Sequence, residues 1–242
     1  MRYGIFSDVH SNLQALSAVM EAYSRENIDR YYCLGDIVGY GADPSRCIAL
    51  VKQLPLISLA GNHDWAAAGV IDYDNFNIEA QEAVIWTRKQ LDSEESLYLK
   101  GLALVLKDKV FTLVHGTLAD PGAFEYMFDE GAAAETFVVM DTRLCFVGHT
   151  HHAGTFIRDG DNRISYERAG DLALEAHYNY IINAGSVGQP RDGDPRAVYC
   201  VYDSLENRVQ IKRITYDVQS ARARIISSGL PGYLGDRLLS GR

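Results

Sequence analysis

The feature that most constrains this chain is a pair of metal-binding residue types, Asp8 and His10, at the end of a short apolar run. Their spacing of two places both side chains on the same side of a strand. Similar residue types beside glycine follow four later apolar runs: Gly35-Asp36, Gly61-Asn62-His63-Asp64, His115-Gly116 and Gly148-His149-Thr150-His151. Because parallel strands present their carboxyl ends along one edge of a sheet, these five stretches can converge on one site.

Each stretch alone is weak evidence for a metal site. A lone Asp-x-His is usually solvated, a lone Gly-Asp is usually a tight turn, and a lone His115 is more often a satisfied core histidine. Together and in order, the stretches indicate a dinuclear site, because divalent metals take carboxylate and amide oxygen and imidazole nitrogen. Six of the seven histidines lie in or beside these junctions. We expect the seventh, His177, to be partly buried and structural.

The succession of elements predicts an α/β (α+β) fold. Strands near 3–6, 31–34 and 56–59 alternate with helices, which implies parallel pairing with right-handed crossovers. Hairpins dominate the second half, and they pair 102–106 with 110–114, 155–157 with 164–166, and 197–202 with 209–214. We therefore expect a four-layer α-β-β-α sandwich, with two mixed β-sheets flanked by helices.

A chain of 242 residues, 47% of them hydrophobic, predicts one domain over 1–242 with a substantial core. Residues 117–141 have the character of a possible cap-like excursion over the site. Phe124, Tyr126 and Phe128 alternate within it; core packing is the favoured interpretation, and lining the mouth of the site is the alternative. Only the tail after Gly229 is expected to be loose.

The two carboxylates that flank other motifs have simple local interpretations. Asp43 precedes Pro44 and is predicted to cap the helix that begins there. Asp64 either orients His63 or caps the Ala-rich stretch that follows it.

Charge and composition restrict the partners. A net charge of −9 argues against general binding to nucleic acid or to anionic membranes, although a small phosphate-bearing substrate is still allowed. No apolar run approaches the ~20 residues that span a bilayer, and the first strand follows Met1 and Arg2 directly, so we expect a cytoplasmic protein. The four scattered cysteines are predicted to be buried reduced thiols. The oligomeric state is left open.

In their order, the five stretches resemble the calcineurin-like metallophosphoesterase superfamily, and the resemblance covers nearly the whole chain. Residues 183–191 resemble a stretch near the C-terminal end of its small bacterial and archaeal phosphodiesterase-type members. The resemblance implies two divalent ions, with Mn²⁺ expected and Fe, Zn²⁺ or Ni²⁺ also suited to mixed oxygen and nitrogen ligands. It implies that one ion is bound by Asp8, His10 and His151, the second by Asn62, His115 and His149, and that Asp36 bridges the two.

The function implied by the resemblance is a metal-dependent hydrolase of phosphate esters, with a small substrate such as a nucleotide-like ester. The nucleophile would be a hydroxide shared by the two metals, and His63 would be the general acid. Protein phosphatases of the superfamily carry an Asp and then an Arg three residues after the bridging Asp, where this chain has Gly39 and Tyr40. This departure favours a phosphodiesterase.

Arg191 is the candidate substrate-binding cation, and Arg196 could serve instead; the alternative for both is a surface ion pair with Asp192 or Asp194. Other functions compatible with the resemblance are a phosphomonoesterase or protein phosphatase, and a non-catalytic protein-binding scaffold of the same fold.

Overall fold

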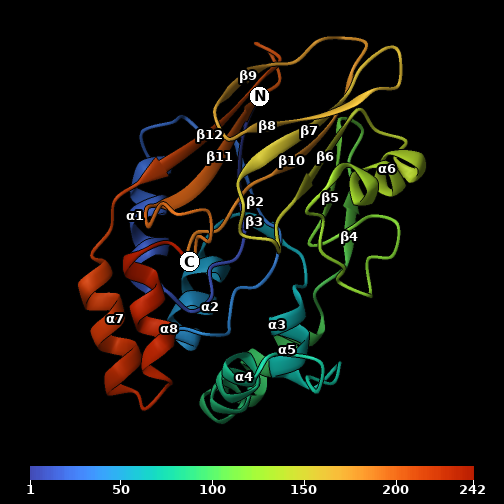
Figure 1. The fold of residues 1–242 in the computed structure, drawn as a ribbon. Helices are drawn as coiled ribbons and strands as arrows, with labels where there is room; N and C mark the ends of the chain where they lie inside the picture. The colour runs from blue at the N-terminus through green and yellow to red at the C-terminus, as the bar shows by residue number, and fades with distance from the viewer.

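Two mixed sheets of six strands each form the centre of the molecule, and helices flank them (Figure 1). The structure is a computed structural model that describes residues 1–242. The strand order is β3-β2-β1-β11-β12-β9 in the first sheet and β4-β5-β6-β10-β7-β8 in the second. The predicted sandwich of two mixed sheets between helices is confirmed.

The first sheet joins a parallel half to an antiparallel half. Its parallel strands are β1 (Arg2–Phe6), β2 (Arg30–Cys33) and β3 (Leu56–Ser58), linked by α1 (Leu13–Tyr23) and α2 (Pro44–Gln53). Its antiparallel strands are β11 (Ala197–Asp203), β12 (Arg208–Ile214) and β9 (Asp171–Ala173). The three parallel strands therefore deliver their following turns to one edge.

The second sheet has the same mixture. Its strands are β4 (Val105–Lys107), β5 (Phe111–Val114), β6 (Leu144–Val147), β10 (Asn179–Asn183), β7 (Gly154–Arg158) and β8 (Ile164–Arg168). Strands β5, β6 and β10 are parallel, and β4, β7 and β8 run antiparallel to their neighbours. The carboxyl ends of β5 and β6 thus also share an edge.

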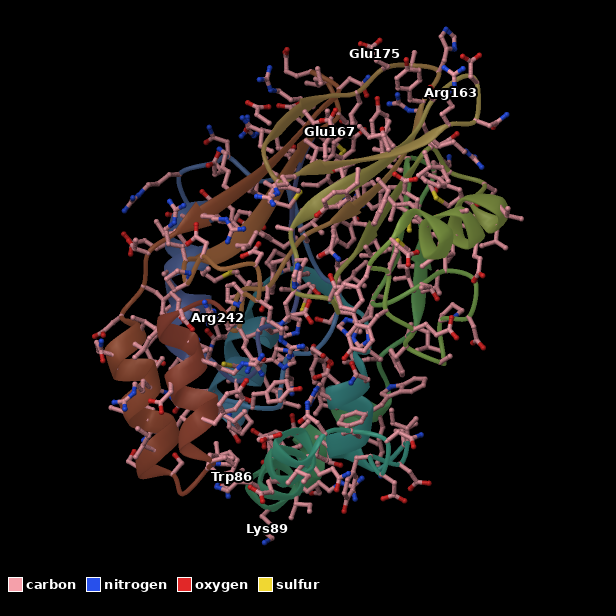
Figure 2. The ribbon with its side chains drawn as sticks, in the orientation of Figure 1. Trp86, Lys89, Arg163, Glu167, Glu175 and Arg242 are labelled. Atoms are coloured by element: carbon pink, nitrogen blue, oxygen red, sulfur yellow. The ribbon has the colours of Figure 1, made fainter.

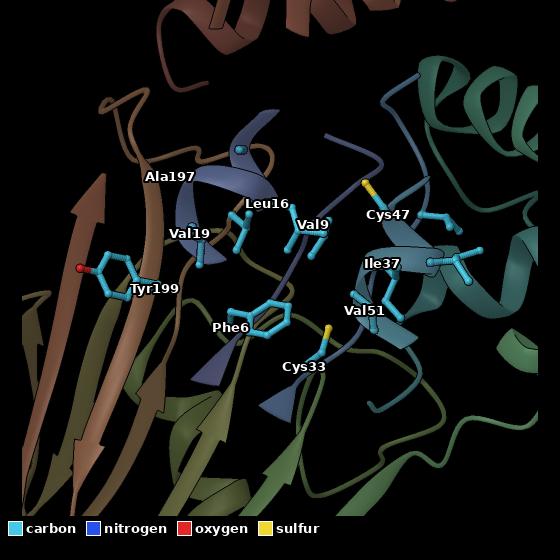
Figure 3. Packing of buried hydrophobic residues seen from close by; sticks show 14 of the residues in the cluster. Phe6, Val9, Leu16, Val19, Cys33, Ile37, Cys47, Val51, Ala197 and Tyr199 are labelled. Atoms are coloured by element: carbon cyan, nitrogen blue, oxygen red, sulfur yellow. The ribbon is translucent and has the colours of Figure 1, made fainter. Parts of the chain in front are cut away.

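Alternation along β1 divides the apolar residues between two cores. Ile5 faces the second sheet, where it belongs to a cluster that includes Phe111 and Phe146. Phe6 points the other way, into a cluster beneath α1 and α2 that Figure 3 shows from close by. Because neighbouring side chains of a strand point to opposite faces, one apolar strand holds both layers together.

The remaining helices cover the ends and the outer faces. They are α3 (Asn62–Ala68), α4 (Ile78–Gln90), α5 (Ser93–Lys100), α6 (Glu130–Val139), α7 (Val218–Ser227), α8 (Gly232–Asp236) and the short 3₁₀ helix η1 (Arg237–Leu239). Helix α6 packs against β7, β8 and β10 on the outer side of the second sheet (Figure 1). None of these helices is long and apolar enough to cross a bilayer. Because α6 lies on the outer side of the second sheet, only the segment of residues 117–141 that precedes α6 faces the predicted ligands.

The predicted loose tail is wrong. After Gly229 the chain forms α8 and η1, and α8 packs beside α7 (Figure 1). Leu230, Leu234 and Leu238 are buried in one cluster with Tyr40. These three leucines thus pack against residues that are distant in the sequence, such as Tyr40.

Several smaller predictions have mixed outcomes. All four cysteines are buried and free, as predicted. Asp43 occupies the N-cap position of α2 with Pro44 after it, as predicted, but its carboxylate makes no capping bond and instead accepts from Arg224 Nη2 at 2.8 Å. His177 is exposed, which contradicts the expectation that it is partly buried.

Candidate metal centre

The predicted ligands lie in the turns that follow β1, β2, β3, β5 and β6. Five of them have positive φ values, which non-glycine residues adopt rarely and at some cost: Asp8, His10, Asp36, His149 and His151, with φ between 48° and 65°. Hydrogen bonds between turns hold two of these conformations, from Asp8 N to Gly35 O at 3.0 Å and from His10 N to Asp36 O at 2.9 Å. The strained turns of the parallel half are therefore fixed against one another.

Glycines beside the ligands allow this close approach. A Cβ atom on Gly61 would lie 2.0 Å from Asp36 Oδ1, and one on Gly148 would lie 2.6 Å from Asp8 Oδ2. Gly39 has a φ of +96°, and a Cβ there would lie 2.7 Å from His63 Nδ1. Glycine at these places is thus required by the packing of the turns against the carboxylates and against His63.

One group of potential ligands consists of Asp8, His10 and His151, all buried. His151 Nε2 lies 3.1 Å from Asp8 Oδ1, and His10 Nε2 lies 3.0 Å from His151 Nε2. Two imidazole nitrogens and a carboxylate oxygen therefore face one another, an arrangement that could hold a metal ion.

A second group consists of Asp36, His115 and His149, also buried. Asp36 Oδ2 lies 3.3 Å from His115 Nε2 and 3.6 Å from His10 Nε2, which belongs to the first group. The Asp36 carboxylate therefore stands between the two groups.

Backbone carbonyls orient three of the imidazoles. His10 Nδ1 donates to Val38 O at 3.1 Å, His115 Nδ1 to Leu34 O at 3.0 Å, and His151 Nδ1 to Gln189 O at 2.5 Å. In a neutral ring this leaves Nε2 without a proton and directed into the centre, as a metal ligand requires.

Four atoms of the predicted ligands are buried and have no hydrogen-bond partner: Asp8 Oδ1, Asn62 Oδ1, His115 Nε2 and His149 Nε2. Buried polar atoms in folded proteins almost always have one. A cation is a natural partner for an amide oxygen and unprotonated imidazole nitrogens, so the donor set fits a metal ion.

Burial and charge shift the pKa values of the site. Burial alone would raise the pKa of Asp36, but the nearby imidazoles, with His115 foremost, hold it well below its usual range. Burial lowers the pKa of His115, yet the Asp36 carboxylate outweighs this and raises it to about 9. Burial lowers the pKa of both His149 and His151 to about 3, which keeps these two rings neutral.

His63 lies at the edge of the two groups. Its ring centroid is 4.4 Å from that of Tyr40 and 5.0 Å from that of Phe76, and its Nδ1 is buried without a partner. Its backbone N donates to Asp36 Oδ1 at 2.9 Å. Burial, opposed in part by Asp36, lowers the pKa of His63 well below its usual value.

Asp64 acts on the backbone. Its carboxylate accepts from Gly61 N at 3.1 Å and Val38 N at 3.0 Å, so it completes the first turn of α3 and ties it to the turn after β2. The N-cap of α3 is Gly61, so the prediction that Asp64 itself is the N-cap is wrong; Asp64 lies within the first turn and bonds the backbone of the N-cap residue. Burial, and then the nearby Asp36 carboxylate, raise its pKa to about 7.

Arg191 forms neither of the predicted ion pairs. Its Nε and Nη2 donate to Gln189 Oε1 at 3.2 and 2.7 Å, and its guanidinium lies 5.6 Å from the centroid of the Tyr40 ring. Asp192 is paired with Arg213 instead, whereas Arg196 does pair with Asp194. The Arg191 charge is therefore unmatched and lies near the site.

A cavity of about 480 Å³ opens beside the centre, and Asn62, His63, Tyr126 and His149 line it. The Tyr126 ring stacks on His149 with centroids 4.0 Å apart, and Phe128 stacks on Tyr126 at 5.3 Å. Core packing is correct for buried Phe124 and wrong for Tyr126 and Phe128, which are 49% and 61% exposed.

Two aromatic residues that line the site were not predicted from the sequence. Tyr40 and Phe76 border the same cavity and hold the His63 ring. No local pattern marks them, because each is a single aromatic residue in a loop. Their role arises only from the packing of two loops.

Two mixed sheets with buried Asp and His groups at the ends of their parallel strands define a class of metal-binding α/β sandwich proteins. Residues 1–207 match the family model of the calcineurin-like phosphoesterase superfamily domain, and the chain belongs to this family. Membership supports phosphoesterase activity in general.

Similar proteins extend over the whole chain. A metallophosphoesterase from Sphaerobacter thermophilus is 41% identical, and its crystal structure matches with a TM-score of 0.89 over 100% of both chains. An uncharacterized protein from Methanocaldococcus jannaschii is 38% identical over 98% of this chain and 97% of its own. A hypothetical protein from Pyrococcus horikoshii is 21% identical, with a TM-score of 0.81 over 100% of this chain and 98% of its own, and shows likeness of fold alone.

Proposed function

We propose that this chain is a metal-dependent hydrolase of phosphate esters that prefers phosphodiesters and holds two divalent ions, with Mn²⁺ the expected metal. The observation that carries the proposal is the position of Asp36, whose Oδ2 lies within 3.6 Å of an imidazole nitrogen from each ligand group. A carboxylate in this place suits a pair of cations, because it offsets their mutual repulsion.

The ligand assignment follows the two groups. Asp8, His10 and His151 would hold one ion, Asn62, His115 and His149 the other, and Asp36 both. Two divalent ions at such a site supply a water-derived nucleophile near neutral pH and positive charge for the phosphoryl oxygens.

His63 is proposed to donate a proton to the leaving oxygen. Tyr40 and Phe76 fix its ring at the border between the ligand groups and the cavity of about 480 Å³. An anionic ester placed there would favour the protonated imidazole, which opposes the effect of burial on the ring.

The preference for diesters rests on the charge available to the substrate. Gly39 and Tyr40 provide neither the carboxylate nor the guanidinium that the protein phosphatases of the family have at these positions. A monoester dianion carries one more negative charge than a diester and gains more from such a cation. One observation favours a phosphomonoesterase as second candidate: the unmatched charge of Arg191 near Tyr40.

The test compares bis(p-nitrophenyl) phosphate with p-nitrophenyl phosphate on the Mn²⁺-loaded protein at one pH. We expect the diester to have the higher kcat/KM. Faster turnover of the monoester, lost in Arg191→Ala but kept in the ion-paired control Arg196→Ala, would establish the phosphomonoesterase instead. Two bound metals without turnover of either ester would favour the scaffold.

A further inference from the structure

A second cavity, of about 530 Å³, is lined by Arg191 and shares no lining residue with the cavity that Tyr126 lines. Its walls come from the turn after β6, the β7–β8 hairpin, the turn after β10, and β12. The charged and polar lining residues are His152, Tyr166, Arg168, Arg191, Asp192 and Arg213. Three guanidinium groups thus surround one space in a chain whose net charge is −9.

Two of the three arginine charges are unmatched. The Arg213 guanidinium pairs with Asp192, and its Nε also lies 3.6 Å from Asp194. The Arg191 guanidinium has only neutral side chains as partners, namely Gln189 and the hydroxyls of Tyr40 and Tyr126. Arg168 forms no ion pair. Glu167 does not neutralise Arg168, because alternation along β8 turns it to the opposite face of the hairpin. The cavity therefore has an excess of positive charge.

The hairpin holds this wall in place. Tyr166 Oη donates to Ala153 O at 3.3 Å across the pair β7–β8. The Tyr166 ring covers Gly154, and a Cβ atom on Gly154 would lie 2.1 Å from Tyr166 Oη. Arg168 pairs with Gly154 across the same two strands and lies on the same face of β8 as Tyr166. The wall of the cavity that carries Arg168 is thus strand β8, which is paired with β7 and held by the Tyr166 side chain.

The same cavity adjoins the metal centre. His152 lines it and directly follows the predicted ligand His151. Arg191 N donates to His151 O at 3.3 Å, and the Gln189 residue that holds the Arg191 side chain also accepts from His151 Nδ1. Gln189 accepts from the Nε and Nη2 donors of Arg191 and carries no charge, so the Arg191 guanidinium keeps its positive charge at the wall of the cavity.

We propose that the cavity between Arg168 and Arg191 binds a second phosphate group of the substrate, so that the protein prefers phosphate esters bearing a further terminal phosphate. Planar guanidinium groups with free donors match phosphate oxygens in charge and in geometry. The inference of an anion site depends only on the cavity and its charges. The inference that the phosphate belongs to the substrate rests on the proposed function.

The anion site is tested without turnover, by modifying arginines with phenylglyoxal and locating the products by mass spectrometry. Inorganic phosphate should slow modification of Arg168 and Arg191. Arg163, in the turn of the same hairpin, has a side chain that is 79% exposed and lies at the outer edge of the molecule (Figure 2), so it is the internal control. Equal rates for Arg168 with and without phosphate would overturn the site.

The source of the phosphate is tested with thymidylyl-thymidine with and without a 5′-terminal phosphate, on the Mn²⁺-loaded protein. We expect a higher kcat/KM for the phosphorylated dinucleotide, chiefly through a lower KM. Arg168→Gln should reduce this preference about tenfold or more, since it removes charge-assisted hydrogen bonds. Arg168→Lys should restore part of the preference, and Arg163→Gln should keep all of it.

The outcomes separate the two proposals. Protection of Arg168 together with equal kcat/KM values for the two dinucleotides would show a site for free anions and would overturn the substrate assignment. Protection without cleavage of either dinucleotide or of the chromogenic esters would leave the anion site standing and refute the proposed hydrolase. A preference that persists in Arg168→Gln would overturn the role of the cavity.

Discussion

Among single residues, Asp36 has the position on which the proposed chemistry depends most. Asp36→Asn keeps the size of the side chain and removes the charge shared by the two groups, so activity should be almost completely lost and bound metal should fall. Metal content and kcat measure this. The control is Asp64→Asn, a buried carboxylate that bonds only backbone amides, which should keep its metal content. An Asp36 variant with two metals and near-normal kcat would refute the bridging role.

His63 permits a second test at this scale, because its ring lies close to both Asp36 and His10. His63→Ala should retain both metals and lose about 10²–10⁴-fold in kcat, the usual contribution of a general acid. Metal analysis alongside kinetics distinguishes the two possible roles. If the variant loses metal, His63 is a ligand.

Tyr126 is the residue whose exposure most changes its interpretation. Its ring is half-exposed, stacks on His149 and lines the cavity beside the centre. Tyr126→Ala should raise KM for nucleotide substrates about 5–150-fold, the size of one base stacking on an aromatic ring, with little change for bis(p-nitrophenyl) phosphate. Equal changes for both substrates would mean that Tyr126 supports His149 and does not contact the substrate.

At the scale of elements, the C-terminal helices are part of the packed structure. Leu234 of α8 is fully buried against α7 and the Tyr40 loop, whereas Leu239 of η1 is 41% exposed. Leu234→Ala should lower the free energy of unfolding by about 2–5 kcal/mol, as large-to-small core changes do. The matched change Leu239→Ala should cost far less. Chemical denaturation compares the two, and similar losses would show that α8 is not well packed.

For the whole molecule, the predicted metal ions would join the two sheets. Asp8 and Asp36 follow strands of the first sheet, and His115 and His149 follow strands of the second. Removal of metal by a chelator should therefore lower the Tm, and Mn²⁺ should restore it in a concentration-dependent way, because an ion that binds only the folded state stabilises that state. Thermal scans should show a smaller response in Asp36→Asn. A Tm independent of metal in the wild-type protein would contradict metal binding at these residues.

The sequence alone determined the features that depend on local spacing. Short apolar runs define the strands, and helical periodicity of the apolar residues defines α1 and α4. Ligand-type residues beside glycine mark the turns after β1, β2, β3, β5 and β6, since only glycine tolerates such close contact with a carboxylate. Helix α5 was missed, because Leu99 is its only buried residue and its apolar periodicity is therefore weak.

Only the tertiary structure decided what depends on partners distant in the sequence. Arg191 is free of Asp192 because Arg213 of β12 pairs with that carboxylate, and this leaves a positive charge between the metal centre and the second cavity. The tail after Gly229 is ordered because the Tyr40 loop and α7 offer it an apolar surface. Asp36 stands between two groups of imidazoles because the two sheets bring their turns together, and no spacing along the chain encodes such a distance.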